Sequence, residues 1–211
     1  MNIGIDVDGV LTDVADYQLR IGAPYFKEKF GREIVDPNAF DVRDIFECTE
    51  KERKKFGWDT IWTYIIRYPA RENAFQIINR LKNEGNKIFI ITSRIYTTNP
   101  WYFGKPFPSP IKGLLCLVSR TILKNWLKRR RIPYDGIHYC SEHYASDKYS
   151  GCKRFSADVM IEDRAENVIA LSKEMKVVCF DAPYNLDCKG ENIYRAHNWD
   201  EVYKIVKVLP E

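Results

Sequence analysis

The sequence predicts an α/β protein of three layers, in which helices cover both faces of a parallel sheet and a small helical cap follows the first strand. Four short apolar runs carry apolar residues at both alternate positions, which is typical of strands buried on both faces. Segments with helical spacing lie between most of these runs. One long stretch, rich in aromatic and charged residues, separates the first run from the others. A length of 211 residues suits one domain with a modest insertion.

The apolar runs predict four strands, at residues 3–7, 87–92, 158–161 and 176–180. Apolar stripes at helical spacing predict helices around 74–81, 122–127 and 168–171, and Gly85 is a plausible C-terminal cap of the first of these. Because strands and helices alternate, we expect a parallel sheet covered on both sides.

Residues 14–72 contain many aromatic residues among dense charges but no strand of comparable strength. Thr49 is typical of a residue that caps the start of a helix, and 61–66 carry a helical stripe. We therefore expect 14–72 to form a helical cap, and 1–13 with 73–211 to form the core. Residues 95–118 are rich in proline and aromatic residues, and we expect a long loop there that is either functional or mobile.

Composition excludes several classes of protein. Lysine and arginine number 33 and aspartate and glutamate 29, so the net charge of +4 is too small to indicate binding to a nucleic acid polymer. No apolar run is long enough to span a membrane, and Met1 leads into the first strand without a basic leader. We expect a cytoplasmic protein that does not bind membranes.

Six cysteines are present, and no two of them form a Cys-x-x-Cys pair, so a disulfide framework is not expected. Cys140, His143 and Cys152 lie near one another in the sequence and could bind zinc, although their spacing matches no common structural site. The alternative is two buried thiols beside a polar loop.

Asp6 and Asp8 give the strongest chemical signal, because they follow the first strand directly. Carboxylates two residues apart on an extended backbone project to the same side, at the sheet edge where α/β proteins bind ligands. Two close carboxylates repel unless a cation neutralises them, and Mg²⁺ with oxygen ligands fits such a site. Gly9 allows a sharp turn there. The alternative is an ordinary strand end with two solvated aspartates.

Two other strand ends strengthen the case. The second strand ends in Thr92, Ser93 and Arg94, of which the threonine hydroxyl and the serine amide could hold a phosphate. The third ends in Glu162 and Asp163. With the first pair they place four carboxylates at one edge, an arrangement that is costly without a cation.

Four elements follow one another in the order of the motifs of haloacid dehalogenase-like (HAD) phosphohydrolases: Asp-Val-Asp-Gly-Val at 6–10, Thr-Ser-Arg at 92–94, a lysine, and Glu-Asp-Arg at 162–164. The chain resembles that superfamily over 1–13 and about 73–182, and most of all its 5′-nucleotidase subgroup, which includes the deoxyribonucleotidases. The resemblance implies a Rossmann-like core, an inserted cap and Mg²⁺-dependent hydrolysis of phosphomonoesters. Members of the subgroup usually carry Asp-Asp-Arg, so Glu162 is a departure.

The resemblance also implies roles. Asp6 is expected to attack phosphorus and form an aspartyl-phosphate, and Asp8 to act as general acid and then general base. Asp163 is expected to bind Mg²⁺ together with Asp6 and the Asp8 carbonyl, with Glu162 supporting these ligands from behind. Thr92, Ser93 and a lysine would hold the phosphoryl oxygens.

That lysine is either Lys148, at a plausible helix start, or Lys153; we prefer Lys148, whose helix would direct its N-terminus at the sheet edge. Arg94 is expected to contact the substrate or to pair with a carboxylate. The cap aromatics Phe26, Trp58 and Trp62 could stack on a base, or they could form the core of the cap.

A nucleoside monophosphate is the first expected substrate, within the broader class of small phosphorylated molecules. The alternatives are a phosphatase of a sugar phosphate or another metabolite, and a non-catalytic binding or regulatory protein on the same scaffold. A homodimer is possible.

Overall fold

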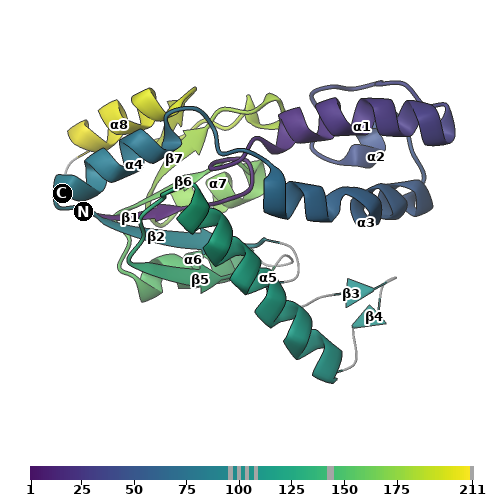
Figure 1. Cartoon of the computed structure of the whole chain (residues 1–211). Coiled ribbons are helices and arrows are strands. Elements are labelled where there is room, and N and C mark those ends of the chain that lie inside the picture. The colour runs from purple at the N-terminus through teal and green to yellow at the C-terminus, as the bar shows by residue number, and fades with distance from the viewer. Residues whose placement is uncertain (95–96, 99–100, 103–104, 107–108, 142–144, 210–211) are drawn as a thin grey trace.

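The computed structural model describes residues 1–94, 97–98, 101–102, 105–106, 109–141 and 145–209. Its centre is a parallel sheet of six strands in the order β5-β2-β1-β6-β7-β8 (Figure 1). The strands are β1 (Asn2–Ile5), β2 (Lys87–Thr92), β5 (Gly136–Tyr139), β6 (Val159–Glu162), β7 (Lys176–Phe180) and β8 (Ile193–Ala196).

Helices cover both faces of this sheet, as the alternation of strands and helices predicts. Alternate side chains of β2 divide between the faces: Ile88 and Ile90 belong to one hydrophobic cluster, and Phe89 and Ile91 to another. Helices α4 (Ala74–Asn83), α5 (Ser109–Arg129) and α8 (Trp199–Val208) pack on the first face. Helices α6 (Ala145–Arg154) and α7 (Ala165–Ser172) pack on the second. The predicted three-layer α/β fold is confirmed.

The four predicted strands are present, and sequence analysis missed the other two strands of the six-stranded sheet as well as the short strands β3 (Trp101–Tyr102) and β4 (Lys105–Pro106). The missed strands of the six-stranded sheet, β5 and β8, lie at its two edges. Most of their side chains are only partly buried. An edge strand has a neighbour on one side only, so it needs no continuous apolar run and gives a weak sequence signal.

The predicted helical stripes also form helices. Gly85 follows α4 with a φ of 91°, a left-handed conformation that favours glycine. The expectation of a loop over 95–118 is wrong for its last part, because α5 begins at Ser109. Pro110 is the second residue of that helix, where proline costs no hydrogen bond, and the leucines that follow are good helix formers.

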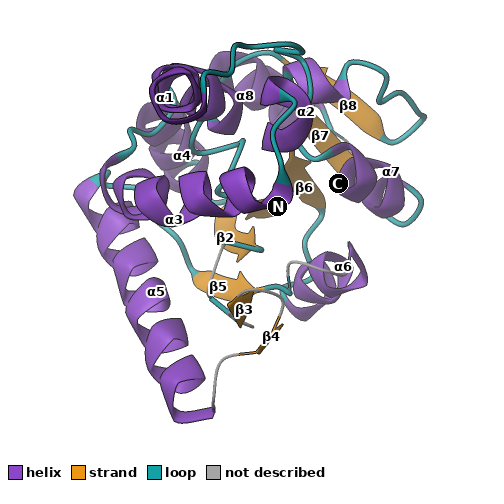
Figure 2. Ribbon diagram, turned by 90° about the vertical axis from the view of Figure 1, so that its right-hand side faces the viewer, coloured by secondary structure: helices purple, strands orange, loops and turns teal. Residues whose placement is uncertain are grey.

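Residues 14–72 contain α1 (Val14–Phe30), α2 (Val42–Phe46) and α3 (Glu50–Arg67). Thr49 caps α3 as predicted, and its side chain and that of Glu52 each accept a hydrogen bond from the other's backbone amide. The three helices share a hydrophobic cluster of their own, and in Figures 1 and 2 they lie beyond one end of the sheet. This arrangement agrees with a cap, but the division into two domains at these boundaries stays a prediction.

Two short strands, β3 (Trp101–Tyr102) and β4 (Lys105–Pro106), pair with each other, and a 3-10 helix spans Pro183–Asn185. In the part of the chain that the structure describes, no helix combines the length and the apolar character needed to cross a membrane.

Candidate active site

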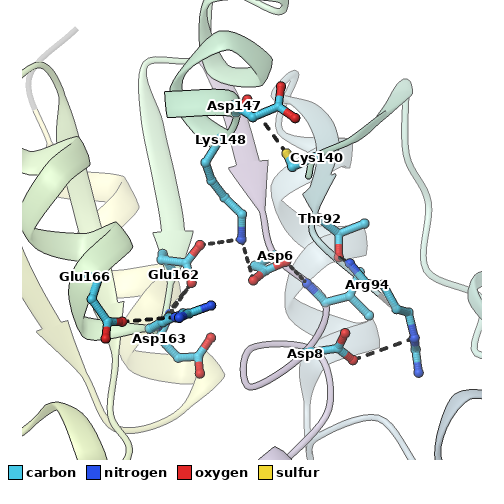
Figure 3. Close-up of polar contacts among 12 residues, drawn as sticks. Asp6, Asp8, Thr92, Arg94, Cys140, Asp147, Lys148, Glu162, Asp163 and Glu166 are labelled. Carbon is cyan, nitrogen blue, oxygen red and sulfur yellow. Dashed lines mark hydrogen bonds and ion pairs between the residues drawn. The ribbon is translucent and has the colours of Figure 1, made fainter. Parts of the chain in front are cut away.

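The carboxyl ends of β1, β2 and β6 bring together side chains that lie far apart in the sequence (Figure 3). Asp6 follows β1, and its amide donates to the carbonyl of Ile161 in β6 at 3.0 Å, so it continues the parallel ladder. Its side chain is buried, and its Oδ1 accepts a hydrogen bond from the amide of Val7 at 2.7 Å. Because β1 lies between β2 and β6, Asp6 stands at the centre of this edge.

Lys148 on α6 reaches the same point from the other side of the site. Its Nζ lies 2.5 Å from Oδ2 of Asp6 and 2.5 Å from Oε2 of Glu162, and its side chain is only 2% exposed. Burial alone would lower the pKa of this ammonium, but the carboxylates of Asp6 and Glu162 outweigh burial and raise the pKa. Lys148 is therefore a permanent cation in the site. Lys153 is exposed and lies over the ring of Tyr149, so it is not part of this cluster.

Glu162 is fully buried at the end of β6, and both its oxygens are occupied. Oε2 contacts Lys148, and Oε1 accepts from the amides of Asp163 at 3.2 Å and Arg164 at 3.1 Å. Burial raises the pKa of this carboxyl, and Lys148 opposes the rise. These contacts fix the Glu162 side chain in place, and its role in supporting metal ligands stays a prediction.

Asp163 is buried, and its Oδ1 has no hydrogen-bond partner among the residues that the structure describes. Its Oδ2 accepts a hydrogen bond from the hydroxyl of Tyr184. Burial, and then the negative charges of Glu162 and Asp6, raise the pKa of Asp163 well above its ordinary value. A buried carboxylate with an unsatisfied oxygen beside two other acids is what a cation would stabilise.

Gly9 makes room for this carboxylate. Its φ is 92°, and a Cβ built on it would lie 1.9 Å from Oδ2 of Asp163. No side chain fits there, so the turn after β1 can approach the end of β6 only because residue 9 is glycine.

The donor set fits a hard divalent cation. In the described part of the chain, one group of three acidic residues has ligand oxygens within 4.8 Å of one another, and it consists of Asp6, Glu162 and Asp163. All donors are oxygens, as Mg²⁺ prefers, and the unpaired Oδ1 of Asp163 adds an independent sign of a missing partner. Within the described residues Glu162 already accepts three contacts, Asp6 two and Asp163 one, so Asp6 and Asp163 have the most lone pairs left for an ion.

Asp8 is held on a different side of the site. Its Oδ1 accepts a hydrogen bond from the hydroxyl of Tyr64 in α3 at 2.8 Å, and Nε of Arg94 lies 3.6 Å from the same oxygen. Burial raises the pKa of Asp8; Arg94 lowers it, Asp6 raises it further, and Tyr64 lowers it. A raised carboxyl pKa suits a group that must carry a proton to a leaving group.

Arg94 is enclosed, with 2% of its side chain exposed. None of its three side-chain nitrogens makes a hydrogen bond to a described residue, and its guanidinium lies over the rings of Tyr64 and Trp126. Its charge partner is Asp8, which agrees with the expectation that it could pair with a carboxylate. Contact with a substrate stays a prediction.

The other two predicted phosphate contacts come from the end of β2. Thr92 is fully buried, and its hydroxyl accepts from the amide of Arg94 at 3.2 Å. Ser93 follows it and is partly buried. Both lie at the edge that carries Asp6, because β1 and β2 are parallel neighbours.

The three cap aromatics proposed to stack on a base are placed differently. Phe26 is fully enclosed and stacks on Phe46 within the cap, the position expected if it forms the core of the bundle. Trp58 and Trp62 are 50% and 37% exposed on α3. Trp62 lies about 200° around the helix from Tyr64, so it points away from Asp8. A contact between these residues and a substrate stays a prediction.

Two residues of the site were missed in the sequence. Tyr64 is one of many aromatic residues in 14–72, and no pattern within that segment indicates that it contacts Asp8. Tyr184 follows β7, a strand that was predicted, so the rule that ligands lie beyond strand ends could have found it. Asn185 fixes it there, since its amide donates to the carbonyls of Asp163 at 2.6 Å and Phe180 at 2.9 Å.

The proposed zinc cluster stays a prediction. Cys140 and Cys152 are buried, as the alternative of two buried thiols also expects. His143 lies outside the described residues.

Residues 1–209 match the family model described as 5′ nucleotidase, deoxy (pyrimidine), cytosolic type C protein (NT5C). The chain belongs to this family. It is 29% identical over 212 residues to a nucleotidase of Clostridium acetobutylicum, an alignment that covers 100% of this chain and 96% of that one.

Solved structures agree on the fold. A predicted phosphatase from Clostridium acetobutylicum has a TM-score of 0.63 at 17% identity, covering 99% of this chain and 98% of its own. A HAD-superfamily hydrolase of subfamily IA from Geobacter sulfurreducens has a TM-score of 0.53 at 13% identity, covering 99% and 98%. The predicted resemblance to HAD-like 5′-nucleotidases is thus confirmed, and this NT5C-family protein is a phosphomonoester hydrolase acting on a small phosphorylated substrate.

Proposed function

We propose that this NT5C-family protein is a Mg²⁺-dependent 5′-nucleotidase that hydrolyses nucleoside monophosphates through an aspartyl-phosphate on Asp6. The observation that carries the proposal is the position of Asp6: a buried carboxylate at the centre of the sheet edge, 2.5 Å from the Lys148 cation and grouped with Asp163. A nucleophile beside a fixed positive charge can approach a phosphoryl dianion with less repulsion.

In the first half of the reaction, an oxygen of Asp6 forms a bond to phosphorus as the bond to the ester oxygen breaks. The departing alcohol takes a proton from Asp8, which becomes a carboxylate. In the second half, a water attacks the phosphorus of the aspartyl-phosphate and gives a proton to Asp8, while the bond between phosphorus and the Asp6 oxygen breaks. The products are the alcohol and phosphate, and both carboxyl groups return to their starting state.

The phosphoryl oxygens carry negative charge throughout, and we assign their binding to Lys148, the hydroxyl of Thr92 and the amide of Ser93. The raised pKa of Lys148 keeps this contact charged at any physiological pH. Glu162 holds Lys148 in place, so it positions a binding group without touching the substrate.

Asp6, Asp163 and the carbonyl of Asp8 are the groups assigned to Mg²⁺, which when bound neutralises the acidic edge and stabilises charge on the phosphoryl group. The fit rests on the oxygen-only donor set, the unpaired Oδ1 of Asp163 and the close approach of the Asp163 carboxylate to the turn, which Gly9 allows.

Family membership and the nucleotidase relative support a nucleotide as the substrate, and a nucleotide substrate agrees with a cytoplasmic location. Residues 14–72 are proposed to act as the cap that selects the leaving group, with 1–13 and 73–211 as the catalytic core.

A hydrolysis screen tests the proposal. Purified protein with Mg²⁺ is offered nucleoside monophosphates, sugar phosphates and other phosphate esters, and released phosphate is measured. We expect the highest kcat/KM for a nucleotide, and no phosphate release from any ester in excess chelator. Turnover of sugar phosphates alone would refute the nucleotide assignment, and undiminished activity in chelator would refute the metal requirement.

A further inference from the structure

Tyr64 connects the cap to the carboxyl ends of β1, β2 and β6, where the candidate active site lies. It lies on α3, in the cap segment, yet its hydroxyl donates to Oδ1 of Asp8 in the core at 2.8 Å. The two residues are separated by 56 positions in the sequence. A cap residue therefore contacts the side chain to which the proposed mechanism gives the proton transfers.

The ring of Tyr64 has little freedom to move. It is buried in the aromatic cluster of the cap, with ring centroids 4.5 Å from Tyr17 and 5.6 Å from Tyr68. The hydroxyl is also 2.8 Å from the hydroxyl of Thr12, which lies in the turn after β1. Packing from the cap and a hydrogen bond from the core thus fix the phenol oxygen from two directions.

Asp8, in contrast, needs such a support. Its side chain is 28% exposed, and the terminal torsion of an aspartate is broad and poorly restrained by itself. In the described part of the chain, the hydrogen bond from Tyr64 and the ion pair with Arg94 both involve Oδ1 of Asp8. Holding one oxygen leaves Oδ2 to exchange a proton with the substrate.

We propose that Tyr64 is a positioning residue that orients Asp8 toward the leaving oxygen, so that the cap completes the acid–base group of the core. This inference rests on the proposed function, because it requires Asp8 to protonate the departing alcohol. A hydroxyl can donate or accept, so the contact can persist whether Asp8 is a carboxylate or a carboxylic acid.

The proposal makes a prediction about leaving groups. A nucleoside leaves as an alkoxide unless it is protonated, so its ester depends strongly on a well-placed acid. p-Nitrophenolate is a stable anion and leaves without help. Loss of positioning must therefore slow the alkyl ester far more than the aryl ester.

The experiment measures kcat/KM of Tyr64→Phe for uridine 5′-monophosphate and for p-nitrophenyl phosphate, with Mg²⁺ present. General acid catalysis contributes roughly 10²–10⁴-fold, and misplacement loses part of it, so we expect a fall of about 10–100-fold for the nucleotide, in kcat rather than KM, and of less than about 3-fold for the aryl ester. Both substrates are hydrolysed by the same folded molecules, so the ratio does not depend on how much of the variant folds.

Tyr17→Phe is the matched control. The Tyr17 hydroxyl lies in the same cluster but donates to Thr60 within the cap, so its removal should leave the ratio unchanged. A nucleotide-to-aryl ratio in Tyr64→Phe equal to that of the wild type or of Tyr17→Phe overturns the proposal. Asp8→Asn distinguishes failure of this inference from failure of the proposed function. If Asp8→Asn loses more activity on the nucleotide than on the aryl ester and Tyr64→Phe does not, the inference fails while the proposed function stands. If Asp8→Asn loses activity equally on both esters, the acid role of Asp8 is itself wrong.

Discussion

Replacing Gly9 by alanine tests how closely the turn after β1 approaches the metal ligand. Gly9 and Gly85 have nearly the same φ, 92° and 91°, in the left-handed half of the map. An alanine at either position adopts a left-handed conformation that costs about 1–2 kcal/mol. The surroundings differ, since the added Cβ at Gly85 meets nothing within 4 Å and that at Gly9 lies 1.9 Å from Oδ2 of Asp163. Comparison of the two variants therefore separates backbone strain from the collision.

The collision cannot be absorbed in place. Ordinary contacts between such atoms begin at about 3.5 Å, so Asp163 or the turn must move by roughly 1.5 Å. A displacement of this size removes a ligand from its place, and disturbing the support of a metal ligand typically costs 10–100-fold in affinity, or about 1.4–2.7 kcal/mol.

Thermal unfolding measured with and without Mg²⁺, together with titration calorimetry, gives both quantities. We expect Gly85→Ala to lose about 1–2 kcal/mol of stability and to keep its affinity for Mg²⁺ and its activity. Gly9→Ala is expected to lose at least as much stability, about 10–100-fold in affinity for Mg²⁺, and activity in proportion. Equal stabilisation of the two variants by Mg²⁺ would show that Asp163 is not a ligand or that the site does not need this glycine.

Three further predictions concern the charged groups of the site. Lys148→Met leaves the buried carboxylates of Asp6 and Glu162 without their cation, so we expect it to cost about 3–5 kcal/mol of unfolding free energy and most of the activity. Lys153→Met, which lies outside the cluster, should change neither quantity. Denaturant unfolding measures the stability of both variants, and phosphate release measures their activity. Asp6→Asn should abolish turnover, remain folded and bind Mg²⁺ more weakly than the wild type. An activity assay checks the turnover, and circular dichroism checks the fold. The raised pKa of Asp163 gives a pH dependence. Below the pKa of Asp163 in the unfolded chain, about 3.8, the neutral carboxyl stabilises the metal-free fold, and this contribution is lost as the pH rises through the pKa of Asp163 in the folded protein. A bound cation offsets the loss. Stabilisation by Mg²⁺ should therefore grow with pH over this range and binding should release protons, which calorimetry in buffers of different ionisation enthalpy detects; stabilisation that is independent of pH would contradict it.

Much of the core could be predicted from the sequence because its central strands are buried on both faces. Such strands must be apolar at every position, so β1, β2, β6 and β7 are visible as runs, and their carboxyl ends identify Asp6, Thr92, Glu162 and Asp163 without a structure. The choice of Lys148 over Lys153 also followed from a local rule, since it depended on where a helix begins.

The parts that could not be predicted depend on contacts between distant segments. The edge strands β5 and β8 take their place from the neighbour they pair with, and their own residues carry little apolar pattern. The start of α5 was not predicted because prolines are typical of loops, although the first turn of a helix also tolerates them. The contact of Tyr64 with Asp8 depends on how the cap meets the core, and no spacing within either segment encodes it.

The most direct test of the account is to find the phosphoryl group on the protein. A single turnover with Mg²⁺ and a nucleoside monophosphate is quenched in acid, and peptides are mapped by mass spectrometry before and after treatment with hydroxylamine. The account predicts phosphate on the peptide that contains Asp6, removed by hydroxylamine and absent from Asp6→Asn. Complete turnover without phosphate on the protein, or phosphate on another side chain, would contradict it.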